Sequence, residues 1–160
     1  MANDPLLSDG VALPGYPLPL GVSYGCNGVN FSVFSRHATA VTLLLFEAPG
    51  DQAAKMSLSL DPLINKTGDI WHIGLASNNG DLFYLWQMDG RFAPREGHRF
   101  NAGLALLDPY AKALVGTDHW DFGRCCEESD SHAEHFPMTK NGGYKPKCLA
   151  QNTPFDWEGD

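Results

Sequence analysis

The feature that most limits the fold of this chain is a series of short apolar segments between Gly21 and Gly90, each bounded by turn residues. Residues 29–33 and 56–60 alternate apolar with polar side chains, which is the period of a strand buried on one face. No helical pattern lies between these segments. Strands that recur at this interval predict an all-β fold, an antiparallel β-sandwich.

Turn signals place the strands more closely. The strands that we predict are residues 29–33, 40–46, 56–60, 70–75 and 82–88. The pairs Asn27-Gly28, Asp61-Pro62 and Asp89-Gly90 favour tight turns at their ends, because Gly, Pro, Asn and Asp adopt the backbone angles that turns need.

Two of these strands are apolar on both faces. In residues 82–88, Leu82, Tyr84 and Trp86 share one face, while Phe83 and Leu85 share the other. Residues 41–46 behave similarly. A sandwich strand normally buries one face and exposes the other to water. The pattern therefore predicts a second covering layer, either the chain's own tail or another domain.

Changes in composition along the sequence divide the chain into three regions. Residues 1–18 are rich in proline and predict an extended lead-in. Residues 19–116 form the predicted sandwich, including a short helix near 108–115 with Asp108 as its N-cap and Pro109 in its first position. Residues 117–160 are polar and rich in glycine, and predict a long, mostly irregular C-terminal extension of the linker type.

Composition excludes several classes of partner. The chain has 19 acidic and 11 basic residues, a net charge of −8, which argues against nucleic-acid binding. No apolar run approaches the roughly 20 residues that span a bilayer, so we expect no membrane partner. No phosphate-binding or dinucleotide motif is present, so we expect no cofactor. The four cysteines favour reduced thiols in an intracellular compartment.

The sequence also offers no catalytic set. Acidic residues fall mostly in predicted turns or in the tail, where turn formation and solvation explain them. There is no Gly-x-Ser-x-Gly motif. Cys125, Cys126, His132 and His135 lie close together in sequence, but their spacing matches no zinc site. We therefore predict no catalytic residues and no metal site in this chain.

Aromatic side chains are the candidates for a binding role, because aromatic rings stack on the apolar faces of sugars. The candidates are Trp71, Trp86 and Phe92. Alternation places Trp71 on one face with Ile73 and Leu75, so core packing is the favoured alternative for it, and Trp86 is similar. Phe92 comes directly after Asp89-Gly90-Arg91 and is expected to be the most exposed of the three.

Several ordered motifs give the chain a family resemblance. They are Gly28-Val29-Asn30-Phe31-Ser32-Val33-Phe34-Ser35, Thr67-Gly68-Asp69-Ile70-Trp71-His72, Gly97-His98-Arg99-Phe100-Asn101, Leu107-Asp108-Pro109-Tyr110-Ala111-Lys112-Ala113 and Pro154-Phe155-Asp156-Trp157-Glu158-Gly159-Asp160. Together they resemble the N-terminal part of isoamylase-type starch- and glycogen-debranching enzymes. Residues 60–69 are most similar to plant and algal isoamylases.

The resemblance implies an immunoglobulin-like sandwich of the family-48 carbohydrate-binding type, followed by a (β/α)8 barrel that hydrolyses α-1,6 branch linkages in glycogen or amylopectin. In this family the catalytic carboxylates belong to the barrel, so the resemblance implies a non-catalytic module. Its implied partners are the barrel of the same parent chain and α-glucan. The implied compartment is the plastid stroma for a plant or algal parent, and otherwise the bacterial cytoplasm.

One departure leaves the role of the module open. Glycogen-binding relatives hold sugar with two tryptophans and a lysine, whereas Phe92 stands here where one tryptophan is expected. The leading hypothesis is a module that supports the barrel and helps to orient branched α-glucan. The alternatives are an autonomous glycogen- or starch-binding module, and a module through which isoamylase subunits assemble into homo- or hetero-oligomers.

Overall fold

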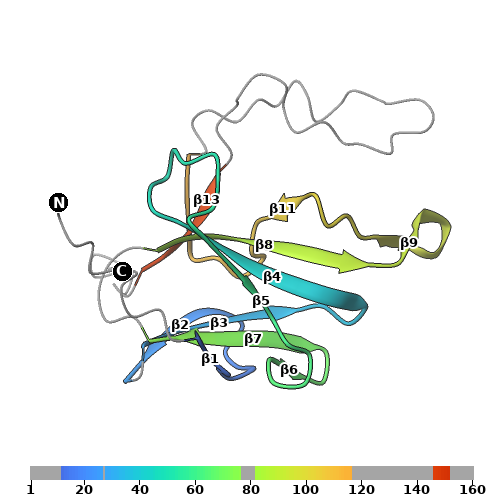
Figure 1. Cartoon of the computed structure of the whole chain (residues 1–160), viewed down its shortest axis with the longest axis horizontal. Helices are drawn as coiled ribbons and strands as arrows, with labels where there is room; N and C mark the ends of the chain where they lie inside the picture. Colours follow the sequence, from blue (N-terminus) through green and yellow to red (C-terminus); the bar gives the residue numbers. More distant parts are fainter. Residues whose placement is uncertain (1–11, 27, 77–81, 117–145, 152–160) are drawn as a thin grey trace, which may run out of the picture.

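Two antiparallel β-sheets packed face to face form the body of the protein (Figure 1). The computed structural model describes residues 12–26, 28–76, 82–116 and 146–151. The first sheet contains β1 (Ala12–Leu13), β7 (Ile70–Leu75), β3 (Gly28–Phe34) and β2 (Gly21–Gly25) in that order, with β6 (Lys66–Thr67) also paired to β7. The second contains β12 (Ala113–Val115), β13 (Lys147–Ala150), β8 (Leu82–Gly90), β4 (Ala38–Phe46) and β5 (Met56–Ser59), with β11 (Ala105–Leu106) also paired to β8.

The predicted β-sandwich is confirmed. All five predicted strands are present as β3, β4, β5, β7 and β8, and the bounds predicted for β7 are those observed. A separate ribbon of β9 (Phe92–Ala93) and β10 (His98–Arg99) comes after β8, and the two strands are joined by the short 3-10 helix η1 (Pro94–Glu96).

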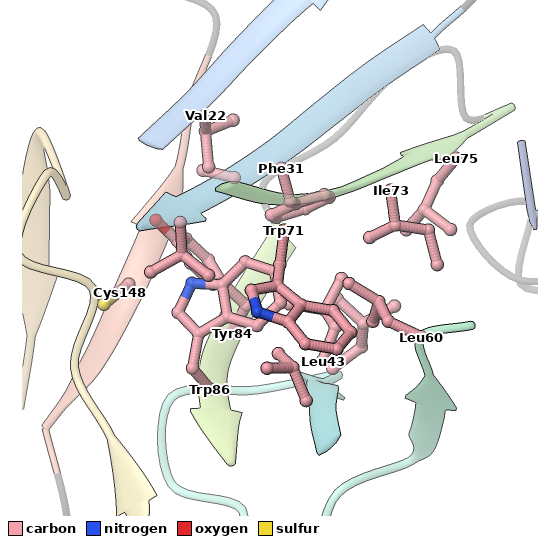
Figure 2. Close-up of a cluster of buried hydrophobic side chains, with 14 of the residues drawn as sticks. Val22, Phe31, Leu43, Leu60, Trp71, Ile73, Leu75, Tyr84, Trp86 and Cys148 are labelled. Atoms are coloured by element: carbon pink, nitrogen blue, oxygen red, sulfur yellow. The ribbon is translucent and has the colours of Figure 1, made fainter. Parts of the chain in front are cut away.

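The core lies between the sheets, where the inward faces of the alternating strands meet (Figure 2). Phe31 of β3 meets Tyr84 of β8 edge to face, with ring centroids 5.0 Å apart. Burial of each large apolar side chain contributes about 1.5–3 kcal/mol, so this cluster supplies most of the stabilisation of the fold. Trp71 of β7 and Trp86 of β8 are both part of it.

The short helix predicted at 108–115 is wrong. The carboxylate of Asp108 accepts a hydrogen bond from the backbone N–H of Tyr110 (2.8 Å), and the N–H of Ala111 bonds to the Asp108 carbonyl (3.1 Å). This capped turn does not continue as a helix, because residues 113–115 become β12 and pair with β13. The local pattern correctly indicated a turn, but pairing with a strand distant in sequence makes the next residues a strand.

The predicted domain boundaries also need correction at both ends. Residues 147–150, assigned to an irregular linker, form β13, which lies between β8 and β12 with Cys148 opposite Tyr84. The rest of the predicted linker, residues 117–145 and 152–160, lies outside the described residues. In the lead-in, residues 12–13 form β1 and pair with the end of β7. The sandwich therefore begins earlier and ends later than predicted.

The proline-rich segment after β1 crosses the outer face of the first sheet. The side chain of Asn30 accepts from the N–H of Tyr16 (2.8 Å) and donates to its carbonyl (3.0 Å). The hydroxyl of Ser32 donates to the carbonyl of Pro17 (2.6 Å). Because Asn30 and Ser32 point away from the core, these bonds hold residues 14–17 as a strap over the sheet.

The second faces of the two doubly apolar strands are covered in part by the chain itself. Leu85 is 3% exposed and Phe46 is buried. Lys147 precedes Cys148 on β13 and is also buried; its ammonium lies 4.7 Å from the centroid of the Phe46 ring and donates to the carbonyl of Pro49 (2.6 Å). Of the two predicted covers, the chain's own C-terminal part is therefore the one observed at Phe46.

Candidate functional site

The most exposed aromatic side chain in the described residues lies on the ribbon of β9 and β10, beyond β8 at one end of the sandwich (Figure 1). Arg99 is opposite Phe92, and His98 is opposite Ala93. Directly opposed residues of an antiparallel pair lie on the same face. Phe92 and Arg99 therefore share one face, where Phe92 is 69% exposed and Arg99 is also exposed. Ala93 and His98 share the other face and are half-buried.

Several contacts fix the shape of this ribbon. The guanidinium of Arg91 donates two hydrogen bonds to the carboxylate of Glu96, at 2.8 and 2.9 Å. Gly97 ends η1 in the left-handed conformation, with φ of 86°. On the inner face, the ring of His98 packs edge-on against that of His37, with centroids 4.7 Å apart. The ribbon is thus braced, and its outer face presents Phe92 in a defined position.

Trp71 and Trp86, the other two predicted sugar contacts, are in the core (Figure 2). Trp71 is 1% exposed and Trp86 is 0% exposed. The indole N–H of Trp71 donates to the carbonyl of Ser35 (3.1 Å), and Lys66 lies over its ring. A ring enclosed by protein has no free face for a sugar. The assignment of these two tryptophans as sugar contacts is therefore wrong, and their core alternative is confirmed.

A buried polar cluster around Asp108 was not predicted. Asp108 is 4% exposed. Its carboxylate accepts from the hydroxyl of Tyr84 (2.9 Å) and, at 3.4 Å, from the indole N–H of Trp86, while its backbone N–H approaches the sulfur of Cys148 (3.2 Å). These bonds fasten the turn after β11 to β8 and β13.

The electrostatics of this cluster suit a structural role. Burial and the neighbouring Asp108 carboxylate raise the pKa of Tyr84, so its hydroxyl remains a donor. Burial likewise raises the pKa of Cys148 to about 11. A thiol with a raised pKa and no access to solvent is a poor nucleophile. The cluster therefore orders the fold by joining the turn after β11 to β8 and β13.

The sequence indicated the buried donors of this cluster but not their acceptor. A buried tyrosine or tryptophan needs a partner for its O–H or N–H, and alternation placed both Tyr84 and Trp86 on the core face. Their partner lies 24 and 22 residues further along the chain. The N-cap interpretation of Asp108 also explained that carboxylate without invoking burial.

Over residues 12–26, 28–76, 82–116 and 146–151, no group of three or more His, Cys, Asp or Glu side chains is placed to hold a metal ion. The sequence cluster at Cys125, Cys126, His132 and His135 lies outside these residues. No helix among them is long and apolar enough to cross a bilayer.

Two antiparallel sheets packed face to face define this chain as a β-sandwich module. Residues 19–111 match the family described as carbohydrate-binding module 48 (isoamylase N-terminal domain). The chain belongs to this family, which confirms the resemblance to isoamylase-type enzymes.

Curated relatives come from plants and bacteria. The chain is 34% identical to isoamylase 1, chloroplastic, of Arabidopsis thaliana, over all of this chain and 19% of that protein. It is 36% identical to isoamylase SU1, chloroplastic, of Zea mays, over 92% of this chain and 18% of that protein. It is 37% identical to the glycogen debranching enzyme of Serratia proteamaculans, over 92% of this chain and 21% of that protein. The chain therefore spans about a fifth of the length of these relatives.

Similarity to solved structures of pullulanases is weaker. The apo pullulanase of Paenibacillus barengoltzii is 23% identical, with a TM-score of 0.47 over 64% of this chain and 14% of that chain. The GBS pullulanase SAP in complex with maltotetraose is 20% identical, with a TM-score of 0.48 over 86% of this chain and 15% of that chain.

Proposed function

We propose that this chain is the non-catalytic N-terminal module of a debranching glycoside hydrolase that cleaves α-1,6-glucosidic branch linkages in glycogen or amylopectin. The observation that carries the proposal is the match of residues 19–111 to the isoamylase N-terminal domain. The span of about a fifth of isoamylases and glycogen debranching enzymes supports it. The partner of the module is the (β/α)8 barrel of the same parent chain, which holds the catalytic carboxylates.

The hydrogen bonds of the described carboxylates support a non-catalytic role. Hydrolysis of a glycosidic bond needs two carboxylates placed on either side of the bond. Here the carboxylates of Asp51, Asp61 and Asp89 each accept from backbone N–H groups of their own turns. That of Asp108 is buried and bonded to Tyr84. These groups shape turns and hold the fold.

Two measurements test this assignment. The 160-residue chain, incubated with amylopectin, should release no reducing ends, and a measurable rate would contradict a non-catalytic module. Sequencing the gene beyond the codon for Asp160 should reveal a reading frame that encodes a (β/α)8 barrel with the acidic residues of the family. A stop codon at that point would instead favour an autonomous binding module.

Positioning of α-glucan is the second part of the proposal, and the exposed ring of Phe92 favours it. Exposure of a large aromatic ring on a braced ribbon suits stacking against a glucose unit. Affinity electrophoresis in amylopectin gels tests it, with gels lacking polysaccharide as the reference. Phe92→Ala should abolish retardation. Phe34→Ala, which removes a second exposed phenylalanine from the outer face of the first sheet, should not.

Assembly of isoamylase subunits through this module remains an alternative proposal. The turn between β5 and β6 favours it, because Leu63 is 92% and Ile64 is 55% exposed. The side chain of Asp61 accepts from the N–H of Leu63 (2.8 Å) and orders this turn. Sedimentation velocity should then show a concentration-dependent dimer that Leu63→Asp disperses. A monomer at every concentration would contradict subunit assembly through this module.

The compartment that we propose is based on the relatives, which include chloroplastic plant proteins and bacterial enzymes. It is the plastid stroma if the source is a plant or alga, and otherwise the bacterial cytoplasm. Fractionation of source cells with an antibody against the chain distinguishes these from a secreted location.

A further inference from the structure

We propose that Arg99 is a second glucan-contact residue, which binds the 2- and 3-hydroxyls of the glucose unit that stacks on or beside Phe92. This inference rests on the proposed positioning of α-glucan. It adds to the aromatic contact a polar contact that selects the ligand.

Register places the two side chains together. Arg99 of β10 is directly opposite Phe92 of β9. Opposed residues have Cβ atoms about 4.5–5.5 Å apart, within reach of one sugar ring and its neighbour. Both side chains are exposed, whereas Ala93 and His98 occupy the face turned towards His37. The outer face of the ribbon thus combines an aromatic ring with a guanidinium.

The guanidinium of Arg99 is available for a ligand. Within the described part of the chain, ion pairs engage Arg36 with Asp69 and Arg91 with Glu96, while Arg99 takes part in none. Glu96, the acidic residue of the ribbon, is held by two hydrogen bonds to Arg91. The same pair stiffens the turn next to Arg99. Less ordering is therefore required when a ligand binds.

The chemistry of α-glucan fits this pair. Glucose units joined through α-1,4 bonds keep the hydroxyls on carbons 2 and 3 free and adjacent. A guanidinium presents parallel N–H groups that can donate to two neighbouring oxygens at once. The C–H face of the same chain packs on an aromatic ring. Phe92 would accept any sugar with an apolar face, and Arg99 would require the adjacent hydroxyls.

The test uses the full 160-residue chain with β-cyclodextrin and two methylated forms of it, measured by isothermal titration calorimetry. One form is methylated on the 2- and 3-hydroxyls, and the other on the 6-hydroxyl. The variant is Arg99→Gln. Its matched control is Arg95→Gln, which changes an exposed arginine of η1 on the same ribbon. The melting temperature of each variant, expected to be unchanged, shows that it folds.

We expect Arg99→Gln to weaken binding of β-cyclodextrin about tenfold, because hydrogen bonds from a charged group contribute about that factor. Arg95→Gln should have no effect. Methylation of the 2- and 3-hydroxyls of the sugar should weaken its binding to the protein with Arg99 by a similar factor. In Arg99→Gln the same methylation should weaken binding little further. Methylation of the 6-hydroxyl should leave binding unchanged.

The outcomes separate this inference from the functions on which it rests. If Arg99→Gln binds as tightly as the unsubstituted chain, or still discriminates against methylation of the 2- and 3-hydroxyls, Arg99 is not the selecting contact, while the Phe92 contact stands. If the unsubstituted chain does not bind β-cyclodextrin, both contacts are overturned. Assignment to a debranching enzyme is then still decided by the gene sequence beyond Asp160.

Discussion

Replacement of Asp108 by alanine removes one carboxylate that accepts hydrogen bonds from three donors, two on β8 and one in its own turn. The hydroxyl of Tyr84 and the indole N–H of Trp86 lose a buried acceptor, at 2.9 and 3.4 Å. The N–H of Tyr110 loses its bond at the turn, 2.8 Å long. Tyr84 and Trp86 are both fully buried, so water cannot replace the lost acceptor without rearrangement of the core.

The cost can be worked from these contacts. An unsatisfied buried donor costs about 1–3 kcal/mol. The short bond to Tyr84 falls in that range, whereas the longer bond to Trp86 and the half-buried bond to Tyr110 contribute less. We expect Asp108→Ala to lower the free energy of unfolding by about 3–5 kcal/mol. Tyr84→Phe removes the donor and leaves Asp108 two other partners, so about 1–2 kcal/mol is expected.

Urea denaturation of the two single variants and the double variant measures the coupling. Asp108→Ala should cost about 1–2 kcal/mol less in the Tyr84→Phe background, because no hydroxyl is then left unsatisfied. Phe92→Ala serves as a control on the surface and should change stability by less than about 0.5 kcal/mol. A cost for Asp108→Ala below about 1 kcal/mol, or strict additivity with Tyr84→Phe, would refute this account of the cluster.

Three further predictions concern a glycine, the accessibility of two cysteines and a pH dependence. Gly15→Ala, in the strap of residues 14–17, should destabilise the fold by about 2–4 kcal/mol, because φ is +72° and a Cβ would lie 2.6 Å from Asn30 Oδ1. Gly97→Ala, with φ of +86° and open space around it, should cost only about 1 kcal/mol. Equal melting temperatures of the two variants would contradict a packed strap. Iodoacetamide should label Cys26 in the folded chain and Cys148 only after unfolding, as measured by peptide mapping. The pKa of Cys148 in the folded chain is raised from 9.0 to about 11. The protonated thiol therefore contributes about 2–3 kcal/mol to the free energy of unfolding below pH 9, and this contribution is lost as the pH rises towards 11. Cys148→Ala should flatten the fall in stability between pH 9 and 11, and an unchanged slope of stability against pH would contradict the raised pKa.

Local alternation was sufficient to predict the strands that are neighbours in sequence. β7 was predicted residue by residue because Trp71, Ile73 and Leu75 alternate with smaller or polar residues and turns bound them on both sides. The exposed position of Phe92 was also predictable, since it comes just after the last long apolar strand, which ends at Gly90. In both cases the information lies within a few residues.

The parts that were not predicted depend on contacts between distant residues. Nothing near Lys147 identifies it as a buried residue of a central strand, because its burial depends on β8, β12 and the carbonyl of Pro49. The turn at Asp108 has the local sequence of a helix start. A strand follows it instead of a helix because residues 113–115 pair with β13. Likewise, the partnership of Phe92 with Arg99 comes from the register of the ribbon.

The strand β8 links the stable part of this module to its proposed binding surface. Tyr84 and Trp86 in its first half are held by the core and by Asp108, while its end leads through Gly90 into the ribbon that carries Phe92. The ribbon has its own brace in the Arg91–Glu96 pair, so we expect its shape not to depend on the Asp108 bonds. Stability and glucan contact should therefore separate: at temperatures where Asp108→Ala remains folded it should bind β-cyclodextrin as the unsubstituted chain does, and a parallel loss of affinity would show that the ribbon takes its shape from the core.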